Sequence, residues 1–426
     1  MGLSPRPEPL RVLRLITRLN VGGPAKHVAW LMTGLDPERF RQTLVTGRVQ
    51  PGEDDMGPWL EQAGVDYRVL PGLGRAINPL ADLGALARVL GLLVRQRPHI
   101  LATHTSKAGF LGRAALLLYR PYARLRGWPR TRAVHTFHGH TFHGYFGPWK
   151  TRLFLALERF LAHRATWRIV VISPRQLQEI HRRYRVGRRR QFVLVPLGID
   201  LEPFRDSEAG RRRFRSQLGL DPEQVLVGAV GRVAPVKNYP LFLETAARLK
   251  KERPQLYRRC RFVLVGGGPP AEMDRLQELA RELDIADQVI LAGNRDDPEN
   301  FFPGLDVLMI TSTNEGTPVS ILEGGACGLP VLATAVGGVP DLLGEVSEEQ
   351  EGGFCLRRRG LSASSGDAAG LAAGLAWLLD HSSRAAALGA SLRDYVHRRH
   401  DKARLVRDIA ALYQTGMVPP TGGDQA

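Results

Sequence analysis

The sequence predicts an α/β protein of two doubly wound, Rossmann-like domains that face each other across a cleft. Short apolar runs alternate with amphipathic helical patterns, the alternation occurs in both halves of the chain, and turns rich in Gly and Pro separate the runs. The 426 residues suffice for two or three domains at roughly 150 residues each. In such folds ligands bind beyond the carboxyl ends of the strands, so we expect the ligand in the cleft.

The first half of the chain predicts a domain at residues 1–198. A long helical pattern at 79–97 stops before Pro98, and the helix at 24–35 has a proline at its first position. The expected strands are 11–17, 42–47, 65–70, 99–104, 133–137, 168–173 and 192–196. The other expected helices are 56–63, 109–119, 150–163 and 174–184.

The second half predicts a domain at residues 199–390, joined to the first by a linker at 198–203. Residues 345–366 are rich in Gly, Ser and Glu and predict a surface loop. In the remaining part, 391–426, we expect a helix at about 402–413 that packs back on the first domain, then a disordered tail. The expected strands are 225–230, 261–265, 288–292, 307–310 and 331–334, and the expected helices are 239–251, 272–283, 319–327 and 367–379.

Composition excludes several classes of protein. Hydrophobic residues make up 43% and charged residues 24%, which excludes a mostly disordered chain. No apolar run reaches the roughly 18 residues of a membrane span, and the proline-containing N-terminus does not resemble a secretion signal. The three cysteines have neither disulfide-framework nor metal spacing. A cytoplasmic protein is therefore expected.

The unusual property is the net charge of +17, to which arginine contributes far more than lysine. Such a charge suits phosphate ligands, an anionic lipid surface or nucleic acid, although a compositional bias toward arginine is an equally good explanation. Basic residues are mixed with aromatic and aliphatic ones at 111–132 and 145–168, and they are dense at 181–190. These segments predict peripheral association with an anionic membrane surface, with amphipathic core helices as the alternative.

The segment Ser312–Gly328 has the pattern of an anion site at the start of a helix. It follows an expected strand, Thr317 can cap a helix, and Pro318 suits the first turn. The backbone amides of residues 316–320 (Gly316, Thr317, Pro318, Val319 and Ser320, of which the proline has no N–H) would then lie at the positive end of the helix dipole.

Two glutamates accompany this helix. Glu315 precedes it and Glu323 lies inside it, about 7–8 Å along the axis from Pro318. That span matches the distance from a phosphate to the ribose of one nucleotide, so one carboxylate can accept from sugar hydroxyls and the other from ribose hydroxyls. A capped helix with two solvated glutamates is the alternative.

A basic loop follows an earlier strand. Arg232 and Lys237 lie five residues apart in the loop 231–238, where two cations can neutralise a diphosphate. The turn 266–269, Gly-Gly-Gly-Pro, follows the next strand but is not the G-x-G-x-x-G pattern, so a dinucleotide cofactor is not expected.

Together these pieces resemble a retaining glycosyltransferase of family 4, with the GT-B architecture. The resemblance covers nearly the whole chain and is most specific in the second half. Two first-half phrases, 103–113 and 135–146, resemble the branch that builds bacterial surface polysaccharides and lipid-linked oligosaccharides. The pieces are Gly22-Gly23, GRVAPVKN (231–238), VLVGGGP (263–269), the Glu315/Glu323 pair in an E-x7-E frame, and VLATAVGGVPDLL (331–343).

The resemblance implies a first domain that binds the acceptor and a second that binds the nucleotide sugar. It implies that Arg232 and Lys237 bind the donor diphosphate, that Glu315 contacts the donor sugar, and that Glu323 binds the ribose. His138 would lie beside the sugar and help to stabilise the charged transition state. Catalytic residues would thus be His138, Arg232, Lys237 and Glu315.

The resemblance implies further contacts. Gly23 would approach the phosphates or the acceptor, and the base would lie near Asn294. UDP is the default nucleotide, and the acceptor would be a polyprenyl-phosphate-linked molecule or a glycan on the inner face of the plasma membrane. The acceptor-side candidates are His104, Lys107, Arg113 and His140.

Neither a metal nor another cofactor is expected. There is no Asp-x-Asp triad, and Arg and Lys would take the place of a metal ion in holding the diphosphate. The spacing of His135, His138, His140 and His143 could supply nitrogen ligands, but no carboxylate or cysteine accompanies them nearby.

The sequence departs from the family pattern in ways that affect sugar preference. Thr317 replaces an aromatic residue or leucine, Gly324-Gly325 replaces Ala-Met, and Asp341 stands where glutamate is common. The remaining alternatives are a nucleotide-sugar epimerase of the same fold, a nucleic-acid-binding protein, and a transferase that has lost catalysis. No nucleic-acid-binding module is recognisable, so nucleic acid is not expected as a partner.

Overall fold

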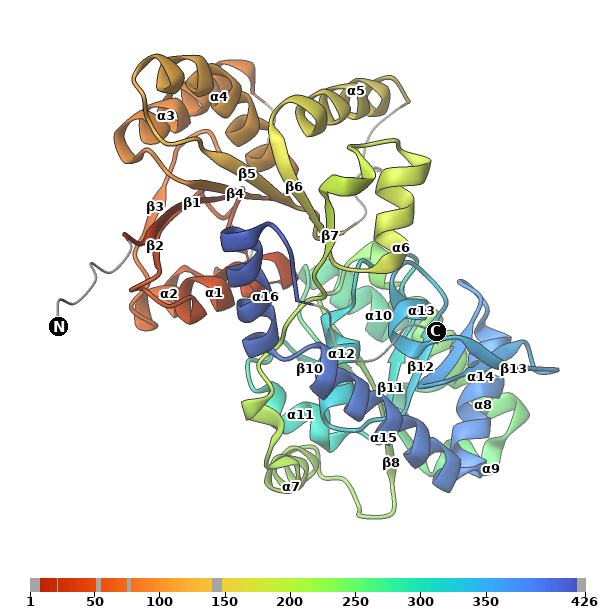
Figure 1. Ribbon diagram of the computed structural model, residues 1–426. Helices are drawn as coiled ribbons and strands as arrows, with labels where there is room; N and C mark the ends of the chain where they lie inside the picture. The colour runs from red at the N-terminus through yellow and green to blue at the C-terminus, as the bar shows by residue number, and fades with distance from the viewer. Residues whose placement is uncertain (1–7, 21, 51–54, 75–77, 140–147, 420–426) are drawn as a thin grey trace. The chain divides into compact units, whose positions relative to one another are not determined.

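The computed structural model describes residues 8–20, 22–50, 55–74, 78–139 and 148–419. The chain forms two compact units (Figure 1). Unit 1 comprises residues 1–198 and 402–426, and unit 2 comprises residues 199–401. The boundary falls after Asp401 instead of residue 390, because helix α15 (Ser382–Arg399) packs against α12 (Val319–Ala326) in unit 2.

Unit 1 contains a parallel seven-stranded sheet with the order β3-β2-β1-β4-β5-β6-β7. The first strand lies in the middle, and the chain winds outward from it in both directions, which is the predicted doubly wound arrangement. The strands are β1 (Leu10–Ile16), β2 (Phe40–Thr46), β3 (Tyr67–Val69), β4 (Ile100–His104), β5 (Arg132–Thr136), β6 (Thr166–Val171) and β7 (Phe192–Leu194).

Helices cover both faces of this sheet because neighbouring strand residues point to opposite sides. Leu13 packs into the cluster that contains α3 and α4 side chains, whereas Val12 packs into the cluster that contains α1 and α16 side chains. The helical segments are α1 (Gly23–Gly34), α2 (Gly57–Gln62), α3 (Pro79–Gln96), α4 (Ser106–Leu125), α5 (Pro148–Arg164), α6 (Pro174–Leu177), the π-helical η1 (Gln178–Arg183), the 3-10 turn η2 (Arg189–Gln191) and α16 (Lys402–Thr415).

The last helix, α16, belongs to unit 1 although the whole of unit 2 precedes it in the chain. Leu405, Ile409, Leu412 and Tyr413 are buried in the same cluster as Val12. The chain leaves unit 1 after residue 198 and returns to it at residue 402, and the two crossing points are neighbours, since Ile199 forms a β-bridge with Asp401.

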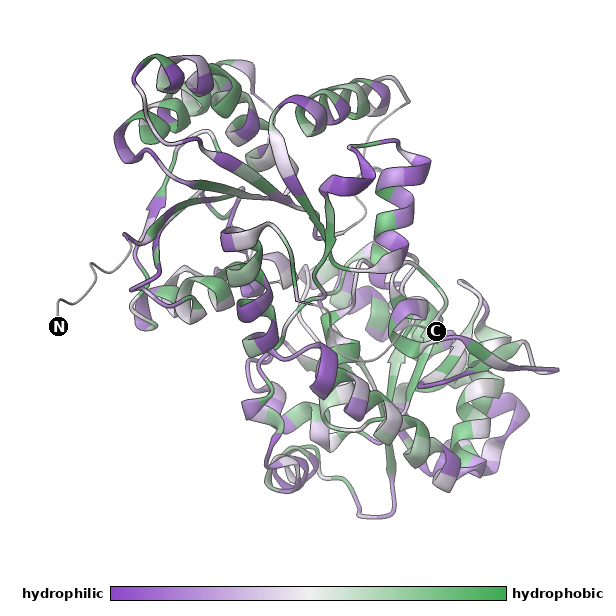
Figure 2. Ribbon diagram, viewed as in Figure 1, coloured by the Kyte–Doolittle hydropathy of each residue, from purple (hydrophilic) through white to green (hydrophobic). Residues whose placement is uncertain are grey.

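Unit 2 contains an eight-stranded sheet with the order β10-β9-β8-β11-β12-β15-β14-β13. Hydrophobic residues predominate in its central strands (Figure 2). The strands are β8 (Val225–Val230), β9 (Cys260–Val265), β10 (Val289–Gly293), β11 (Val307–Ile310), β12 (Val331–Thr334), β13 (Val346–Gln350), β14 (Phe354–Arg357) and β15 (Gly360–Ala363).

Two helices of unit 2 begin with a side-chain cap. Asp367 caps α14 by accepting from the Gly370 amide, and Asp206 caps α7 by accepting from the Ala209 amide. Besides α12 and α15, the helical segments are η3 (Glu202–Phe204), α7 (Ser207–Gln217), η4 (Pro235–Lys237), α8 (Tyr239–Glu252), α9 (Pro254–Arg258), α10 (Pro270–Glu282), η5 (Ala286–Gln288), α11 (Pro298–Gly304), α13 (Val339–Leu343) and α14 (Ala368–Asp380).

The predicted surface loop at 345–366 is wrong. Strands β13 and β14 form an antiparallel hairpin, and β15 pairs in parallel with β12. Phe354, Leu356 and Leu361 are buried in the core of unit 2. These few apolar side chains, set among Gly, Ser and Glu, suffice to add the segment to the sheet.

Among the described residues, no helix combines the length and the apolar character that crossing a membrane requires.

Candidate active site

In unit 2 the glycine turns after β8, β9 and β10 approach one another closely. The Gly266 amide donates to the carbonyl oxygen of Gly293 at 2.8 Å. A Cβ on Gly266 would lie 1.9 Å from the Gly231 carbonyl oxygen, and the Tyr239 hydroxyl donates to that same oxygen at 2.7 Å. The absence of side chains thus brings the carboxyl ends of three parallel strands together, where ligands of this fold class bind.

An ion pair lies at this edge of the unit 2 sheet. Lys237 Nζ lies 2.7 Å from Glu315 Oε1, and the two side chains are 22% and 12% exposed. The Ser312 hydroxyl donates to the same carboxylate oxygen at 2.7 Å. The Thr311 hydroxyl donates to the Lys237 carbonyl oxygen at 2.9 Å, which ties the basic loop to the end of β11. Two residues predicted for the donor site are therefore in direct contact.

The backbone beneath Glu315 is held by a second glycine pair. Gly337 has a φ of +52°, and a Cβ there would lie 1.7 Å from the Glu315 carbonyl oxygen. A Cβ on Gly338 would lie 2.0 Å from the Gly316 carbonyl oxygen. The turn after β12 therefore supports the peptide that carries the glutamate.

Helix α12 starts at Val319, and Pro318 is its N-cap residue. The predicted Thr317 cap is wrong, because no side chain caps this helix and the buried Thr317 hydroxyl has no partner among the described residues. The first turn instead contains the amide of Ile321 bonded to the Pro318 carbonyl. The amides of Val319 and Ser320, like those at the start of any helix, have no carbonyl partner within α12.

Three other residues predicted for the donor site also lie in unit 2. Arg232 is exposed and forms no ion pair with any described residue. Asn294 is exposed beside the Gly267 backbone, where an added Cβ would lie 3.1 Å from the asparagine Cβ. Glu323 is half-buried on α12, and it contributes with burial to raising the pKa of Cys327 to about 12. Lys237, Glu315 and the start of α12 thus lie at one edge of unit 2, whereas Glu323 lies within α12 and interacts with Cys327 near the end of that helix.

Next to Asn294, Arg295 is already paired. Its guanidinium donates to both oxygens of Asp297, at 2.7 and 2.5 Å, and to the Gln217 amide oxygen at 2.9 Å. The guanidinium hydrogen bonds lower the pKa of Asp297. This pair orders the loop after β10 beside the site predicted for the base.

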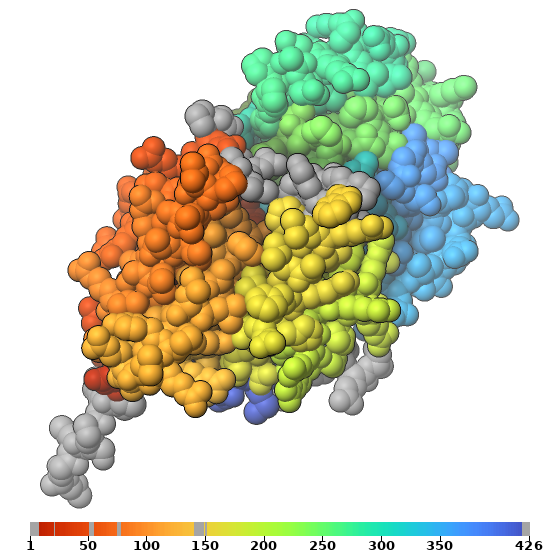
Figure 3. Space-filling view, turned by 90° about the horizontal axis from the view of Figure 1, so that it is seen from above, coloured from red at the N-terminus to blue at the C-terminus, as the bar shows by residue number. Residues whose placement is uncertain are grey.

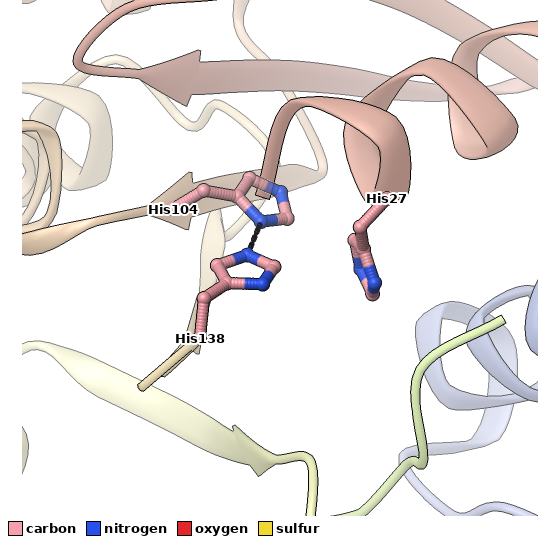
Figure 4. Close-up of side chains that lie close together, drawn as sticks. All are labelled: His27, His104 and His138. Carbon is pink, nitrogen blue, oxygen red and sulfur yellow. Dashed lines mark hydrogen bonds between the residues drawn. The ribbon is translucent and has the colours of Figure 1, made fainter. Parts of the chain in front are cut away.

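In unit 1 three histidines gather at the carboxyl edge of the sheet (Figure 4). His27 lies on α1, one turn after the predicted phosphate-approaching Gly23; His104 ends β4; and His138 follows β5. Nδ1 of His104 lies 2.9 Å from Nε2 of His138, and the His27 and His138 ring centroids are 4.9 Å apart. The carboxyl ends of β4 and β5 lie at the same edge of the sheet because the strands are parallel, which brings His104 and His138 together.

A buried arginine supports this cluster. Arg14, in the middle of β1, is 0% exposed. Its Nη1 lies 3.2 Å from His104 Nε2 and 3.2 Å from the Tyr413 hydroxyl of α16, and its Nη2 donates to the Gln42 amide oxygen at 2.9 Å. All three partners are uncharged, which is unusual for a buried guanidinium.

The imidazoles of the cluster favour the neutral form. Burial lowers the pKa of His138 to about 3. Burial is also the main cause that lowers the pKa of His104 and His27 well below the usual value, with added repulsion from His138 and Arg14. Neutral imidazoles carry one N–H donor and one acceptor nitrogen each.

The other predicted acceptor-side residues, and the remaining histidines of the possible metal spacing, have protein partners or lie outside the described residues. Lys107 Nζ lies 2.6 Å from the Asp82 carboxylate. Arg113 is fully buried, and its guanidinium donates to Glu158 at 2.6 and 2.8 Å and to the Gly109 carbonyl at 2.7 Å. His135 is buried and bonds to the Thr103 hydroxyl at 2.9 Å. His140 and His143 lie outside the described residues.

Sequence reasoning missed Arg14, His27 and Tyr413. One signal was present, since a charged residue in the apolar run of the first strand needs a buried partner. Nothing in the spacing indicated which partner, because His104 is 90 positions away.

Comparisons with known proteins identify both units. Residues 22–198 match the family described as glycosyl transferase 4-like domain, and residues 210–394 match glycosyl transferases group 1. Neither matching family supports the epimerase or the nucleic-acid-binding alternative.

The UDP-Gal:alpha-D-GlcNAc-diphosphoundecaprenol alpha-1,3-galactosyltransferase of Escherichia coli is 30% identical over 269 residues, covering 63% of this chain and 66% of that enzyme. The D-inositol 3-phosphate glycosyltransferase of Mycobacterium marinum is 35% identical over 179 residues, covering 41% of this chain and 36% of that enzyme. The chain thus matches less than two thirds of the length of these relatives.

Among solved structures, Anabaena HepE in complex with UDP and glucose superimposes with a TM-score of 0.75, at 20% identity, covering 95% of this chain and all of that one. At this identity the likeness establishes the fold. With the two family matches and the relatives, it confirms the predicted GT-B architecture: the chain belongs to the GT-B glycosyltransferases of family 4 type.

Proposed function

We propose that the protein transfers a sugar, with retention of anomeric configuration and without a metal ion, from a UDP-sugar to a lipid-linked or polysaccharide acceptor. The observation that carries this proposal is the edge of unit 2 where the Lys237–Glu315 pair adjoins the uncapped start of α12. The cation and the helix amides at this edge suit a diphosphate, and the carboxylate suits a sugar hydroxyl.

The proposed chemistry begins with cleavage of the bond between the anomeric carbon and the diphosphate oxygen. The developing charge on the leaving diphosphate is met by Arg232, Lys237 and the amides of Val319 and Ser320, which are positioned before the reaction. Glu315 orients the donor sugar, and Glu323 accepts from the ribose hydroxyls. The acceptor hydroxyl attacks the same face, and its proton passes to the leaving phosphate oxygen.

UDP is proposed as the nucleotide. The E. coli relative is named for a UDP-galactose donor, and HepE was solved with UDP. Exposed Asn294 and the ordered Arg295–Asp297 loop lie where the base is expected.

The experiment is a thermal-shift panel with UDP, GDP and ADP and their sugar conjugates in EDTA. A ligand at 100 times its Kd stabilises the folded protein by about 2.7 kcal/mol, which raises the unfolding midpoint measurably. We expect a shift with UDP compounds that Arg232→Ala abolishes and the distant Arg248→Ala retains. A folded sample that responds to none of these nucleotides contradicts the proposal.

Retention and metal independence need separate readouts. The anomeric configuration of the product is read from its proton NMR coupling constants and compared with that of the donor. An inverted product contradicts retention. Loss of transfer in EDTA, restored by Mg²⁺ or Mn²⁺, contradicts metal independence. Neither of these two results would contradict the proposal that the protein transfers a sugar.

For the acceptor we propose a polyprenyl-diphosphate-linked sugar at an anionic membrane, on its cytoplasmic side. The acceptor named for the E. coli relative, a diphosphoundecaprenol-linked sugar, supports this class. The three cysteines are free thiols, as in proteins of a reducing compartment.

A surface on α4 and α5, which neighbour each other in unit 1, supports membrane contact (Figure 3). Trp149 is 81% exposed, and Arg124 on α4 and Arg152 on α5 are exposed as well. Aromatic and aliphatic groups with arginines between them suit the interface of an anionic bilayer. The exposed apolar residues of this α4–α5 surface are Phe110, Leu118, Tyr122, Leu125, Trp149, Leu153 and Phe160.

Cosedimentation with vesicles tests the α4–α5 surface. We expect binding to phosphatidylglycerol vesicles that weakens with salt and in the double variant Trp149→Ser/Leu153→Ser. Leu80→Ser, at an equally exposed site on α3, serves as the matched control. Equal binding by both variants, or equal binding to neutral vesicles, contradicts the membrane proposal.

A further inference from the structure

The histidine cluster of unit 1 contains hydrogen-bonding atoms that its own neighbours do not satisfy. Both ring nitrogens of His27 and Nδ1 of His138 are buried and have no partner among the described residues. A buried polar atom without a hydrogen-bond partner destabilises the folded protein. The cluster is therefore complete only when another polar group joins it, and the chemistry that it offers depends on where the imidazole protons lie.

The hydrogen bonds determine those positions. A guanidinium can only donate, so His104 Nε2, 3.2 Å from Arg14 Nη1, is an acceptor. The proton of the neutral His104 ring is then on Nδ1, which lies 2.9 Å from His138 Nε2 and donates to it. Because Nε2 of His138 accepts, the proton of this second neutral ring is on Nδ1.

The orientation of the rings agrees with a hydrogen-bond chain that runs from Arg14 through His104 to His138. Figure 4 shows His104 and His138 joined through one nitrogen each, with the second nitrogen of His138 on the side of its ring that faces His27. Arg14 also donates to the Tyr413 hydroxyl and to the Gln42 amide oxygen, whereas its Nε has no partner among the described residues.

A metal ion is the competing explanation, since nitrogens of His27, His104 and His138 all lie within 4.8 Å of one another. A neutral His104 that bound a metal through Nδ1 would carry its proton on Nε2, directly opposite the Arg14 donor. Two donors would then face each other at 3.2 Å, and the guanidinium charge would repel the cation. The arrangement therefore favours a hydrogen-bond chain over a metal site.

The geometry points to Arg14 and His104 as positioning residues that hold His138 as its Nδ1–H tautomer. His138 thereby presents a hydrogen-bond donor to an oxygen of the substrate and cannot act as a general base at that nitrogen. This inference rests on the proposed sugar transfer for the identity of the oxygen, but the tautomer itself does not depend on it.

Burial keeps the pKa of His138 far below neutrality, so the donor is an uncharged N–H over the working pH range. An uncharged donor can stabilise a developing negative charge or hold a sugar hydroxyl without repelling an oxocarbenium-like centre, as an imidazolium would. A fixed tautomer also removes the need to rearrange protons when substrate binds.

The test is a two-bond proton–nitrogen correlation spectrum of the full-length protein labelled with ¹⁵N-histidine, without substrate. Loss of signals in His138→Gln identifies the resonances of His138. We expect a proton-bearing Nδ1 and a lone-pair Nε2 in the wild-type protein. In Arg14→Met we expect a mixture of tautomers, whereas Arg14→Lys, which keeps a donor, restores the wild-type pattern in part.

Kinetics separate positioning from folding. With the nucleotide sugar that the thermal-shift panel identifies, Arg14→Met should lower kcat roughly 10-fold, as expected for one lost hydrogen bond to the substrate, while KM for the donor stays unchanged. Tyr413→Phe, which removes one acceptor of Arg14 but no member of the chain Arg14–His104–His138, serves as the matched control and should keep the tautomer and kcat.

Three results would overturn the inference. They are a wild-type His138 protonated on Nε2, an Arg14→Met protein with unchanged tautomer and kcat, and stoichiometric Zn²⁺ binding that His104→Gln abolishes. The wild-type spectrum answers the question even if Arg14→Met does not fold. If the spectrum is as expected but no nucleotide sugar is a substrate, the positioning role stands and the proposed transfer fails.

Discussion

Single glycines determine how closely the loops of unit 2 approach one another. Gly337 combines a positive φ of +52° with a backbone oxygen 1.7 Å from the position of an added Cβ. Gly366 also has a positive φ, of +82°, but nothing lies within 4 Å of its added Cβ. A comparison of the two glycines therefore distinguishes the cost of a positive φ, which both share, from the cost of a steric clash, which only Gly337 would have.

We expect Gly337→Ala to destabilise unit 2 by roughly 2–4 kcal/mol, the sum of conformational strain and overpacking, and to weaken UDP binding by moving Glu315. Gly366→Ala should cost only about 1 kcal/mol and leave binding unchanged. Urea unfolding and UDP titration of both variants measure this. Equal effects would show that the close approach to the Glu315 carbonyl has no energetic importance.

At the same scale, Arg232, Asn294 and Glu315 lie in turns that follow strands, as the motifs predict, and their role in binding the donor stays a prediction. The Lys237–Glu315 contact could not be read from spacing, because 78 residues separate the partners. Ser312, which donates to Glu315, had no recognisable signal of its own. Side-chain pairing of this kind depends on which strands become neighbours.

Among the elements, α12 begins without a side-chain cap, and α14 begins with one. Thr317→Val removes a hydroxyl that has no partner in the described part of the chain, so we expect the free energy of unfolding to change by less than about 0.5 kcal/mol. Asp367→Ala, by contrast, should destabilise unit 2 by about 1 kcal/mol. Denaturant unfolding compares them. A Thr317→Val protein as unstable as Asp367→Ala would mean that the hydroxyl caps α12 after all.

The histidines at the ends of β4 and β5 and on α1 predict a pH dependence of unit 1. The folded-state pKa values of His27, His104, His135 and His138 are all lowered, mainly by burial. Below pH 6.5 the unfolded chain therefore binds more protons than the folded one. Stability is full above the unfolded value and falls with acidification between about 6.5 and the folded values, at up to about 1.4 kcal/mol per pH unit for each histidine.

Tryptophan fluorescence measures this effect. Five of the six tryptophans are in unit 1, so Trp377→Phe confines the signal to that unit. Urea unfolding between pH 5 and 8 should show a slope below pH 6.5 that becomes shallower in His27→Gln. A unit 1 stability that is constant over this range would contradict the neutral, buried imidazoles.

At the scale of the whole molecule, the two units differ in how their chain is assembled. Unit 2 is one continuous segment whose ends pair with each other, the Ile199 amide donating to the His400 carbonyl at 2.7 Å. Unit 1 includes α16, which follows the whole of unit 2 in the sequence and contributes Leu405, Ile409 and Leu412 to the core of unit 1.

We therefore expect the fragment 199–401 to fold on its own and to bind UDP, and the fragment 1–198 to aggregate because one face of its sheet lacks α16. Circular dichroism melting curves and size-exclusion chromatography of the two fragments check this. A cooperatively folded, monomeric 1–198 fragment would show that α16 is dispensable for unit 1.

The sequence by itself determined the alternation of strands and helices, the approximate bounds of most elements, and the motifs on which the proposed donor site rests, because periodicity, caps and turn residues act over a few neighbouring positions. Only the tertiary structure decided that β13, β14 and β15 join the sheet and that Arg14, His104 and Tyr413 meet. Those contacts link residues far apart in the chain, which strand order and burial bring together. Local sequence patterns do not indicate which distant residues will be partners.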